Sequence, residues 1–369
     1  MMTQRILCIL DSLDAGGAET FMMKLYRAMD RDAYQMDFVV CASGCYDEEV
    51  LRLGGRVYRI PLRTKHPVRS FRELKKLVRA NHCRYVLKLC TEPIAAVDLI
   101  AARLGGAAWI GARSCNAGSA SGTARRLLNR LLRPLFNSVL DYKLAPSDLA
   151  ARYTFGRRAY ERGEVVILPN ALDLSIYRFD SRGRHEVRAE FGLAPDAHII
   201  GHVGRFSGQK NHAFLLDIFA AIHSADPAAR LLLVGEGELE QTVREKAERL
   251  GLTDAVVFTG VRSDIPRLLS AMDVFVFPSL YEGMPNAVIE AQATGLPCVI
   301  ADTITREADI TGLVRYMPLT ASAEAWSDAA LGAIAPERAD TSAAFLENGY
   351  DIASVAAQFT DLIFHHGGV

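Results

Sequence analysis

Glu282 and Glu290 are the two residues of this 369-residue chain whose type and spacing most clearly suggest chemistry. They follow an apolar run, Asp273–Phe277, that is typical of a buried parallel strand. After this run, Gly283–Asn286 opens a helix that ends at Gly295. One glutamate precedes the start of this helix and the other follows it. Backbone N–H groups at the start of a helix attract phosphate. The carboxylates cannot help to bind phosphate by charge, so we expect them to accept hydrogen bonds from hydroxyl groups. The pattern indicates a ligand with an anionic centre between two sugars; a surface turn with two ordinary glutamates is the alternative.

The segment 279–297 resembles the signature of the retaining family 4 glycosyltransferases. It reads Ser-Leu-Tyr-Glu-Gly-Met-Pro-Asn-Ala-Val-Ile-Glu-Ala-Gln-Ala-Thr-Gly-Leu-Pro, with seven residues between its two glutamates. Within that family it is most similar to the enzymes that assemble bacterial capsule and exopolysaccharide. The resemblance implies an α/β chain with the GT-B fold, in which two Rossmann-like, doubly wound domains face a cleft and the C-terminal helix crosses back to the first domain.

The same resemblance assigns roles to a second loop, which follows the strand-like run 199–204. Arg205 and Lys210 match the arginine and lysine with which the family binds the donor diphosphate, although by position alone they belong to an unremarkable surface loop. Arginine offers a bidentate fork and lysine a point charge. By the family's pattern Glu290 binds the ribose and Glu282 the transferred sugar. The expected catalytic residues are Glu282, Arg205 and Lys210, and the expected donor-binding residues are Gly204, Arg205, Lys210, Arg262, Glu282, Gly283, Met284, Asn286 and Glu290.

The N-terminal half contributes the expected acceptor or cleft residues Gly16, Gly17, Arg113 and Asn116. A strand, a Gly-Gly loop and a helix suggest a phosphate site only weakly. Related enzymes often carry His-Ser-His-Asn where this chain has Arg113-Ser-Cys-Asn116, so no histidine base can be carried over. Arg113 can still meet sugar hydroxyls or phosphate, but it cannot accept a proton at pH 7.

The sequence favours a reaction without metal or cofactor. The only Asp-x-Asp triplet, Asp30-Arg31-Asp32, has no further ligands near it, and Cys41 and Cys45 are the only close cysteine pair. Fixed cations and helix N-termini can offset a leaving diphosphate instead. The family then implies transfer of a sugar from a nucleotide-sugar, chiefly a UDP-sugar, to a glycan acceptor on a lipid carrier. The diphosphate departs as the acceptor hydroxyl attacks from the same face.

Length and alternating β and α patterns predict two domains with parallel sheets. The expected boundaries are residues 1–170 with the helix at 350–369 for the acceptor-binding domain, and 171–349 for the nucleotide-sugar domain. The net charge of −1 conceals a division: residues 1–170 hold 27 Lys and Arg against 16 Asp and Glu, about +11, and the remainder holds 15 against 27, about −12. The basic half therefore faces something anionic. No nucleic-acid motif is present, which leaves an anionic membrane surface.

Residues 124–136 provide the candidate membrane contact. Five leucines (127, 128, 131, 132 and 135) fall on one helical face and Arg126, Arg130 and Arg133 on the other, which suits a helix lying in a membrane interface. The alternative is that the leucines pack on the domain while the arginines are solvated. Pro134 is expected to kink or end the helix. Scattered cysteines and the lack of a long apolar stretch favour a cytoplasmic protein, peripheral on the inner face of the membrane.

Two other functions stay open at this stage. A nucleotide-sugar epimerase of the same fold would need catalytic acids and histidines that have no evident place in the sequence. A non-catalytic partner subunit is favoured by Arg113 and Cys115, whereas the intact Arg205, Lys210, Glu282 and Glu290 oppose it. The sugar, the acceptor, the linkage and the oligomeric state are not determined by the sequence.

Overall fold

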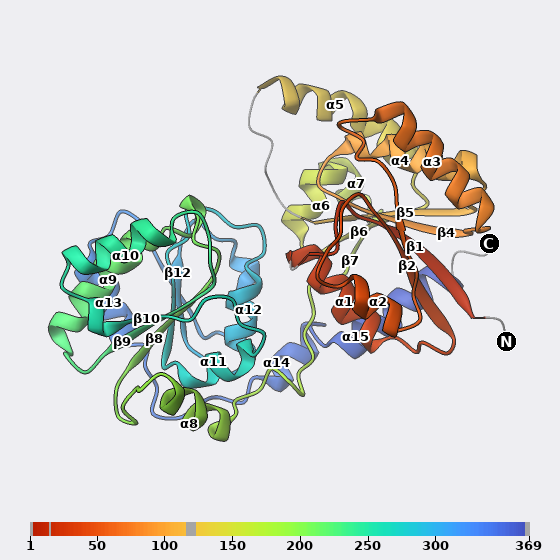
Figure 1. Cartoon of the computed structure of the whole chain (residues 1–369). Helices are drawn as coiled ribbons and strands as arrows, with labels where there is room; N and C mark the ends of the chain where they lie inside the picture. Colours follow the sequence, from red (N-terminus) through yellow and green to blue (C-terminus); the bar gives the residue numbers. More distant parts are fainter. Residues whose placement is uncertain (1–2, 15, 116–122, 366–369) are drawn as a thin grey trace. The chain divides into compact units, whose positions relative to one another are not determined.

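The computed structural model describes residues 3–14, 16–115 and 123–365, without the side chains of residues 123–126 (Figure 1). The chain divides into a first unit, Met1–Leu172 with Gly349–Val369, and a second unit, Asp173–Asn348. Each unit is built on a parallel sheet between helical layers, which confirms the predicted α/β class.

The described residues of the first unit form a seven-stranded parallel sheet with the order β3-β2-β1-β4-β5-β6-β7. Its central strands are largely buried because helices cover both faces of a parallel sheet. The strands are β1 (Gln4–Ile9), β2 (Tyr34–Val40), β3 (Val57–Arg59), β4 (Tyr85–Cys90), β5 (Trp109–Ser114), β6 (Tyr142–Ala145) and β7 (Val165–Ile167).

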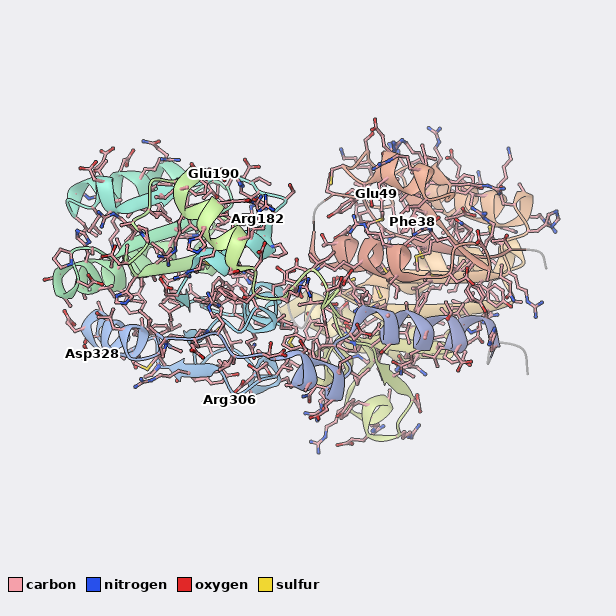
Figure 2. The ribbon with its side chains drawn as sticks, turned by 90° about the horizontal axis from the view of Figure 1, so that it is seen from below. Phe38, Glu49, Arg182, Glu190, Arg306 and Asp328 are labelled. Carbon is pink, nitrogen blue, oxygen red and sulfur yellow. The ribbon has the colours of Figure 1, made fainter. Side chains whose placement is uncertain are left out.

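Two helical layers enclose this sheet (Figure 1). One layer comprises α3 (Pro67–Ala80), α4 (Ala96–Gly105), α5 (Thr123–Ser138), α6 (Asp148–Phe155) and α7 (Arg157–Glu161). The other comprises α1 (Gly17–Ala28), α2 (Asp47–Arg52) and α15 (Ile352–Thr360), followed by a π-helical turn, Asp361–His365. Phe38, labelled in Figure 2, is fully buried on that second side.

The C-terminal helix returns to the first unit, as predicted. Leu172, the last residue of the unit's main segment, donates its N–H to the Tyr350 carbonyl and accepts from the N–H of Ile352, both at 2.9 Å. Helix α15 then packs on α1, burying Ile352 and Phe359. These contacts make the last segment part of the first unit's core.

The described residues of the second unit form a six-stranded parallel sheet with the order β10-β9-β8-β11-β12-β13. The strands are β8 (Ile199–Val203), β9 (Arg230–Val234), β10 (Val256–Phe258), β11 (Val274–Phe277), β12 (Cys298–Ala301) and β13 (Val314–Met317). Helices α9 (His212–Ala225), α10 (Glu240–Arg249) and α13 (Ala323–Leu331) lie over one face, and α8 (Ser181–Glu190), α11 (Ile265–Ala271) and α12 (Asn286–Ala293) over the other (Figure 1); α14 (Ser342–Glu347) follows.

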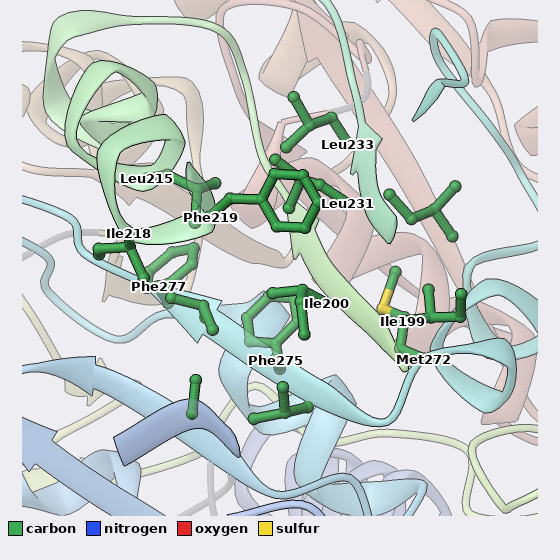
Figure 3. Packing of buried hydrophobic residues seen from close by; sticks show 14 of the residues in the cluster. Ile199, Ile200, Leu215, Ile218, Phe219, Leu231, Leu233, Met272, Phe275 and Phe277 are labelled. Carbon is green, nitrogen blue, oxygen red and sulfur yellow. The ribbon is translucent and has the colours of Figure 1, made fainter. Parts of the chain in front are cut away.

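The core of the second unit joins these layers (Figure 3). Phe219 of α9 lies beside Leu231 and Leu233 of β9, while Phe275 and Phe277 of β11 occupy the middle of the sheet (Figure 3). All five side chains are almost completely buried. Such packing fixes the strand ends from which the candidate site is built.

Helix α5 departs from the sequence prediction in two respects. It continues past Pro134 to Ser138, held by Asn137, which donates to the Phe155 carbonyl at 2.8 Å. Its packed face is formed by Asn129 and Phe136, which are buried. Arg133 also turns inward and donates to the Tyr153 carbonyl at 3.0 Å, so its place on a free polar face is wrong. Burial lowers the pKa of this guanidinium.

Four of the five leucines of α5 do not pack on the unit, contrary to the alternative interpretation, whereas Leu132 is partly buried. Leu127, Leu128, Leu131 and Leu135, which we call the leucine face, are exposed, and Leu131 reaches 69%. Arg130 is also exposed. The helix therefore presents an apolar stripe on the side opposite to its packed residues.

A buried network of ion pairs lies at the amino ends of the central strands of the second unit. Both oxygens of Asp273 are engaged, by Arg184 at 2.6 Å and by Arg188 at 2.7 Å. Asp273 also accepts the N–H of Ile199 at 2.7 Å, at the start of β8. The network ties α8 to the two central strands of the sheet.

Candidate active site

The candidate site lies at the carboxyl ends of β8 and β11. These neighbouring strands mark the point where the strand order reverses direction, since β9 and β10 follow on one side and β12 and β13 on the other. Loops at such a switch point diverge and leave a crevice where α/β proteins bind ligands. The loop 204–211 leaves β8 and the loop 278–285 leaves β11, so the predicted donor residues come together here.

Hydrogen bonds made by Gln209 and Asn211 join the two loops. Leu280 donates its N–H to the Gln209 carbonyl at 2.9 Å, and the Gln209 side chain donates to the Tyr281 carbonyl at 2.9 Å. Asn211 adopts a left-handed conformation with φ of 55° and donates to the Pro278 carbonyl at 3.2 Å. Asparagine tolerates this backbone conformation better than most residues. The loops therefore form one connected surface.

Lys210 and Glu282 form the polar centre of that surface. Their Nζ and Oε1 atoms are 2.6 Å apart, and the side chains are only 18% and 10% exposed. The ammonium also lies 4.6 Å from the centroid of the Phe277 ring. The lysine is therefore held at a fixed position beside the crevice rather than moving freely in solvent.

Glycines allow this close approach. A Cβ atom at Gly204 would lie 3.2 Å from Cε of Lys210, and one at Gly235 would lie 2.3 Å from the Gly204 carbonyl oxygen. Phe206 donates its N–H to the Glu236 carbonyl at 3.0 Å. The turn 235–237 is thus packed against the backbone of the first loop, which fixes the course of the chain from Gly204 to Lys210.

Glu290 lies on α12, whose first residue is Asn286. Its Oε1 accepts a hydrogen bond from the Tyr177 hydroxyl at 3.1 Å. Gly283 and Met284 precede the helix and are partly buried, as is Glu290 itself. Tyr177 could not be predicted as a partner of Glu290, because the two residues are 113 positions apart and no local pattern links them.

The relatives of this chain identify its family. Residues 197–335 match the family described as glycosyl transferases group 1. Over 360 residues the chain is 35% identical to the putative glycosyltransferase EpsF of Bacillus subtilis (strain 168), covering 94% of this chain and 93% of that protein. The chain is a group 1 glycosyltransferase.

Other relatives match over smaller regions or by fold. A stretch of 143 residues is 33% identical to the Escherichia coli UDP-Gal:alpha-D-GlcNAc-diphosphoundecaprenol alpha-1,3-galactosyltransferase, covering 38% of this chain and 37% of that enzyme. The structure of Anabaena HepE in complex with UDP and glucose aligns with a TM-score of 0.76 at 20% identity, over 97% of this chain and 99% of HepE. WaaG, a glycosyltransferase involved in lipopolysaccharide biosynthesis, aligns with a TM-score of 0.70 at 15% identity, over 97% and 99% of the two chains. These alignments confirm the GT-B fold.

Two further residues predicted to bind the donor of this glycosyltransferase differ in their availability. Arg205 is exposed and pairs with Glu238 at 3.2 Å, so its guanidinium can turn toward a ligand. Arg262 instead bonds Asp264 at 2.8 Å and Glu190 at 2.6 Å; Glu190 lies at the end of α8 (Figure 2). These carboxylates raise the pKa of Arg262. The Arg262 side chain is therefore engaged in ion pairs within the unit, whereas the backbone of its loop takes no part in them.

Arg113 of the glycosyltransferase does not meet the expectation of a ligand-facing residue. It is 1% exposed, and it donates to the Leu168 carbonyl at 3.0 Å and to Oδ1 of Asn170 at 2.7 Å. Its guanidinium also lies 3.9 Å from the centroid of the Phe21 ring. Burial lowers the pKa of Arg113 to about 10. The residue fastens the end of β7 to the core instead of facing a substrate.

The other predicted acceptor or cleft residues of the first unit are Gly16, Gly17 and Asn116. Gly16 precedes α1, and a Cβ atom there would lie 2.3 Å from Oε2 of Glu19. The Glu19 carboxylate therefore lies at the start of this helix. Gly17 is the first residue of the helix, and Asn116 lies outside the described residues. No local feature of Gly16 and Gly17 therefore adds to the weak sequence evidence for a phosphate loop.

Within the described ranges, no three His, Cys, Asp or Glu side chains are grouped to hold a metal ion. Asp30, from the Asp-x-Asp triplet, accepts the N–H of Asp32 at 3.1 Å and shapes the turn after α1.

Two buried histidines pack against the loop 204–211. The rings of His202 and His212 are 4.7 Å apart, and His212 stacks on Phe206 at 4.3 Å. His202 donates from Nδ1 to the Val276 carbonyl at 2.9 Å, and neither ring nitrogen of His212 has a hydrogen-bond partner in the described part of the chain. Burial, aided by the charge of Lys210, lowers the pKa of His212 to about 4. Burial also lowers the pKa of His202.

We expect these histidines to make the second unit sensitive to acid. Because the folded-state pKa of His212 lies below 6.5, the ordinary pKa of histidine, its contribution to stability is complete above pH 6.5 and is lost as the pH falls toward 4. The contribution is on the order of 3 kcal/mol. His212→Phe, which keeps the stacking on Phe206, should gain stability relative to the wild type as the pH falls through this window. Urea unfolding at pH 7, 6, 5 and 4 measures the difference; a difference independent of pH would contradict it.

Proposed function

We propose that this glycosyltransferase transfers a sugar from a UDP-sugar to a lipid-linked glycan acceptor with retention of anomeric configuration, in exopolysaccharide or capsule assembly. The Lys210–Glu282 pair at the β8/β11 crevice is the observation that carries the proposal. It puts a fixed cation and a hydroxyl-binding carboxylate within one hydrogen bond of each other, as a sugar diphosphate requires. The printed names of the E. coli galactosyltransferase and of the HepE complex, which contain UDP-Gal and UDP, support the choice of donor.

The proposed reaction uses charge stabilisation more than proton transfer by the protein. The bond between the sugar C1 and the diphosphate oxygen breaks, and negative charge grows on the diphosphate. Lys210, Arg205 and the first N–H groups of α12 would stabilise that charge. The acceptor oxygen forms the new bond to C1 on the same face, and its proton passes to the departing phosphate oxygen. Glu282 would orient the sugar and Glu290 the ribose.

We further propose that the reaction needs no divalent metal, because Arg205 and Lys210 would supply the positive charge. Activity should then survive an excess of EDTA. Loss of activity on chelation, restored by magnesium or manganese, would contradict this part of the proposal.

The function is tested with radiolabelled UDP-sugars, each incubated with and without a polyprenyl-diphosphate-linked sugar. We expect one donor to label the lipid fraction, and we expect the product to keep the anomeric configuration of the donor by NMR. Conversion of the UDP-sugar to its epimer without acceptor would identify an epimerase instead. No turnover of any donor under either condition would favour a non-catalytic subunit.

The leucine face of α5 supports a further part of the proposal, docking of the first unit on an anionic membrane. The unit holds 27 Lys and Arg against 18 Asp and Glu, a net charge of +9. The leucines supply apolar area and the unit's charge supplies attraction to anionic lipid. None of the described helices combines the length and apolar character needed to cross a bilayer.

Replacing both Leu127 and Leu131 with Asn should release the protein from vesicles. Each leucine is more than half exposed and would contribute about 1.5–3 kcal/mol on burial in lipid. The double variant should therefore bind phosphatidylglycerol vesicles at least about 100-fold more weakly in sedimentation assays. Leu346→Asn, at a 56% exposed position of α14, is the matched control and should bind like the wild type.

Binding of the wild type should also weaken as salt rises, since the charge attraction is screened. A wild-type protein that stays in the supernatant at low salt would contradict the docking proposal.

A further inference from the structure

Lys88 occupies an unusual position in the first unit. It lies on β4, paired in register with Ile9 of β1, and only 6% of its surface is exposed. The strands β1 and β4 are the point where the strand order of the first unit's sheet reverses, since β2 and β3 follow on one side and β5 to β7 on the other. Lys88 is thus at the switch point where a doubly wound sheet offers a ligand crevice.

The Lys88 ammonium is not satisfied by its neighbours. Its Nζ lies 3.6 Å from Oδ2 of Asp98 and 4.0 Å from Oδ1 of Asp11, and it makes no hydrogen bond to any described residue. Arg63 occupies the same Asp98 oxygen at 2.6 Å. An ammonium carries three donors, and these are therefore available to a ligand. The arrangement lacks an acceptor.

The surrounding charge indicates what that acceptor is. Lys88 and Arg63 bring two positive charges to one buried carboxylate, Asp98, whereas Asp11 has a side chain 85% exposed to solvent. The cluster therefore has one positive charge in excess at its buried side. Asp98 lies in the first turn of α4, which continues directly from a 3-10 turn at Pro93–Ala95.

Lys143 provides a comparison within the same sheet. Its side chain, on β6, is 11% exposed, close to the 8% of the Lys88 side chain. Lys143 donates to Oε2 of Glu164 at 3.1 Å and so has the partner that Lys88 lacks. A buried lysine on a strand of this unit can therefore have a hydrogen-bonded carboxylate partner. Lys88 lacks one because of its own surroundings and not because of burial.

We propose that Lys88, with Arg63, binds a phosphate or diphosphate group of the acceptor at the carboxyl ends of β1 and β4. The inference rests on the proposed function in that the anion belongs to the acceptor substrate, and it deepens that function by naming the acceptor's chemical class. The phosphate oxygens take the free donors of Lys88, and Asp98 holds both cations in place. A lipid-linked sugar diphosphate and a soluble sugar phosphate share this chemistry.

The first test measures binding without turnover. Saturating UDP fills the donor crevice, and inorganic pyrophosphate is then titrated into the protein by calorimetry. We expect the wild type and Lys143→Met to bind pyrophosphate, Lys88→Met to bind at least 10-fold more weakly, and Lys88→Arg to keep most of the affinity. No pyrophosphate binding by the wild type, or equal binding by Lys88→Met, overturns the subsite. Absence of UDP binding counts against the proposed function instead.

The second test compares acceptors at fixed UDP-sugar. For Lys88→Met, the acceptor KM should rise at least 10-fold for a polyprenyl-diphosphate sugar and stay unchanged for the same sugar as a neutral alkyl glycoside, with the donor KM unaltered. Because KM does not depend on the folded fraction, partial unfolding of the variant cannot imitate this result. A soluble sugar phosphate that responds like the lipid-linked acceptor identifies the phosphate alone as the ligand; a KM change of equal size for the neutral glycoside overturns the proposal.

Discussion

Lys210→Ala should lower kcat by about 100-fold or more, which corresponds to roughly 2.7 kcal/mol of transition-state stabilisation. The physical reason is that the ammonium is already fixed, 2.6 Å from Glu282 and 4.6 Å from the Phe277 ring, before any charge develops on the leaving diphosphate. A preorganised cation interacts more strongly with the transition state than with the ground state, so kcat should suffer more than the donor KM. Steady-state kinetics with saturating acceptor measure both constants.

The matched control for this variant is Arg182→Ala, since Arg182 is an exposed cation of the same unit on α8 (Figure 2). We expect its kinetics to equal those of the wild type. Full activity of Lys210→Ala at limiting donor would mean that Lys210 is not at the diphosphate.

Asp273→Ala should lower the free energy of unfolding of the second unit by about 3–5 kcal/mol, because it leaves a buried arginine without its counter-charge. Arg188 has a side chain only 4% exposed, and Asp273 is the carboxylate within 2.7 Å of it. Urea unfolding followed by circular dichroism measures the loss.

Asp217→Ala serves as the control, since Asp217 pairs with Lys246 at 2.7 Å but has a side chain 42% exposed. That change should cost about 1 kcal/mol or less. Similar losses for the two variants would show that the Asp273 network contributes no more than a surface ion pair.

Local signals were sufficient to predict several elements. The sequence is sufficient to predict α6 from Asp148, because Ser147 is a favourable N-cap, and in the structure it accepts the N–H of Ala150 at 3.3 Å. The apolar run before Glu282 is β11, and the helix after Pro285 is α12. Each of these signals acts within a few residues, so sequence reasoning can find it.

Partners distant in the chain account for what could not be predicted. Arg262 finds Glu190 at a separation of 72 residues, and Arg113 finds Leu168 at a separation of 55. Both residues are arginines, a type expected to bind anionic ligands, but their guanidinium groups make hydrogen bonds within the fold instead. Tyr177, which bonds Glu290, was missed for the same reason.

Helix α5 shows a related limit of periodicity. The pattern separates leucines from arginines, but it does not say which side faces the unit. Asn129 and Phe136 form the packed side, and the Phe136 ring stacks on Phe155 at 5.7 Å. Two residues of unlike character thus decide the orientation. Helix α3 was not predicted, although Phe71, Leu74, Leu77 and Val78 recur at helical spacing among its charged residues.

The most direct test of the central claim, that the β8/β11 crevice binds the nucleotide-sugar, is a calorimetric titration of UDP into the wild type, Glu290→Ala and Glu248→Ala. Glu290 bonds Tyr177 beside the crevice, whereas Glu248 is an exposed residue of α10. We predict that UDP binds the wild type and Glu248→Ala with equal affinity and binds Glu290→Ala at least about 10-fold more weakly, because two ribose hydroxyls lose a charged acceptor. Equal affinity for all three proteins, or no binding to the wild type, would contradict the claim.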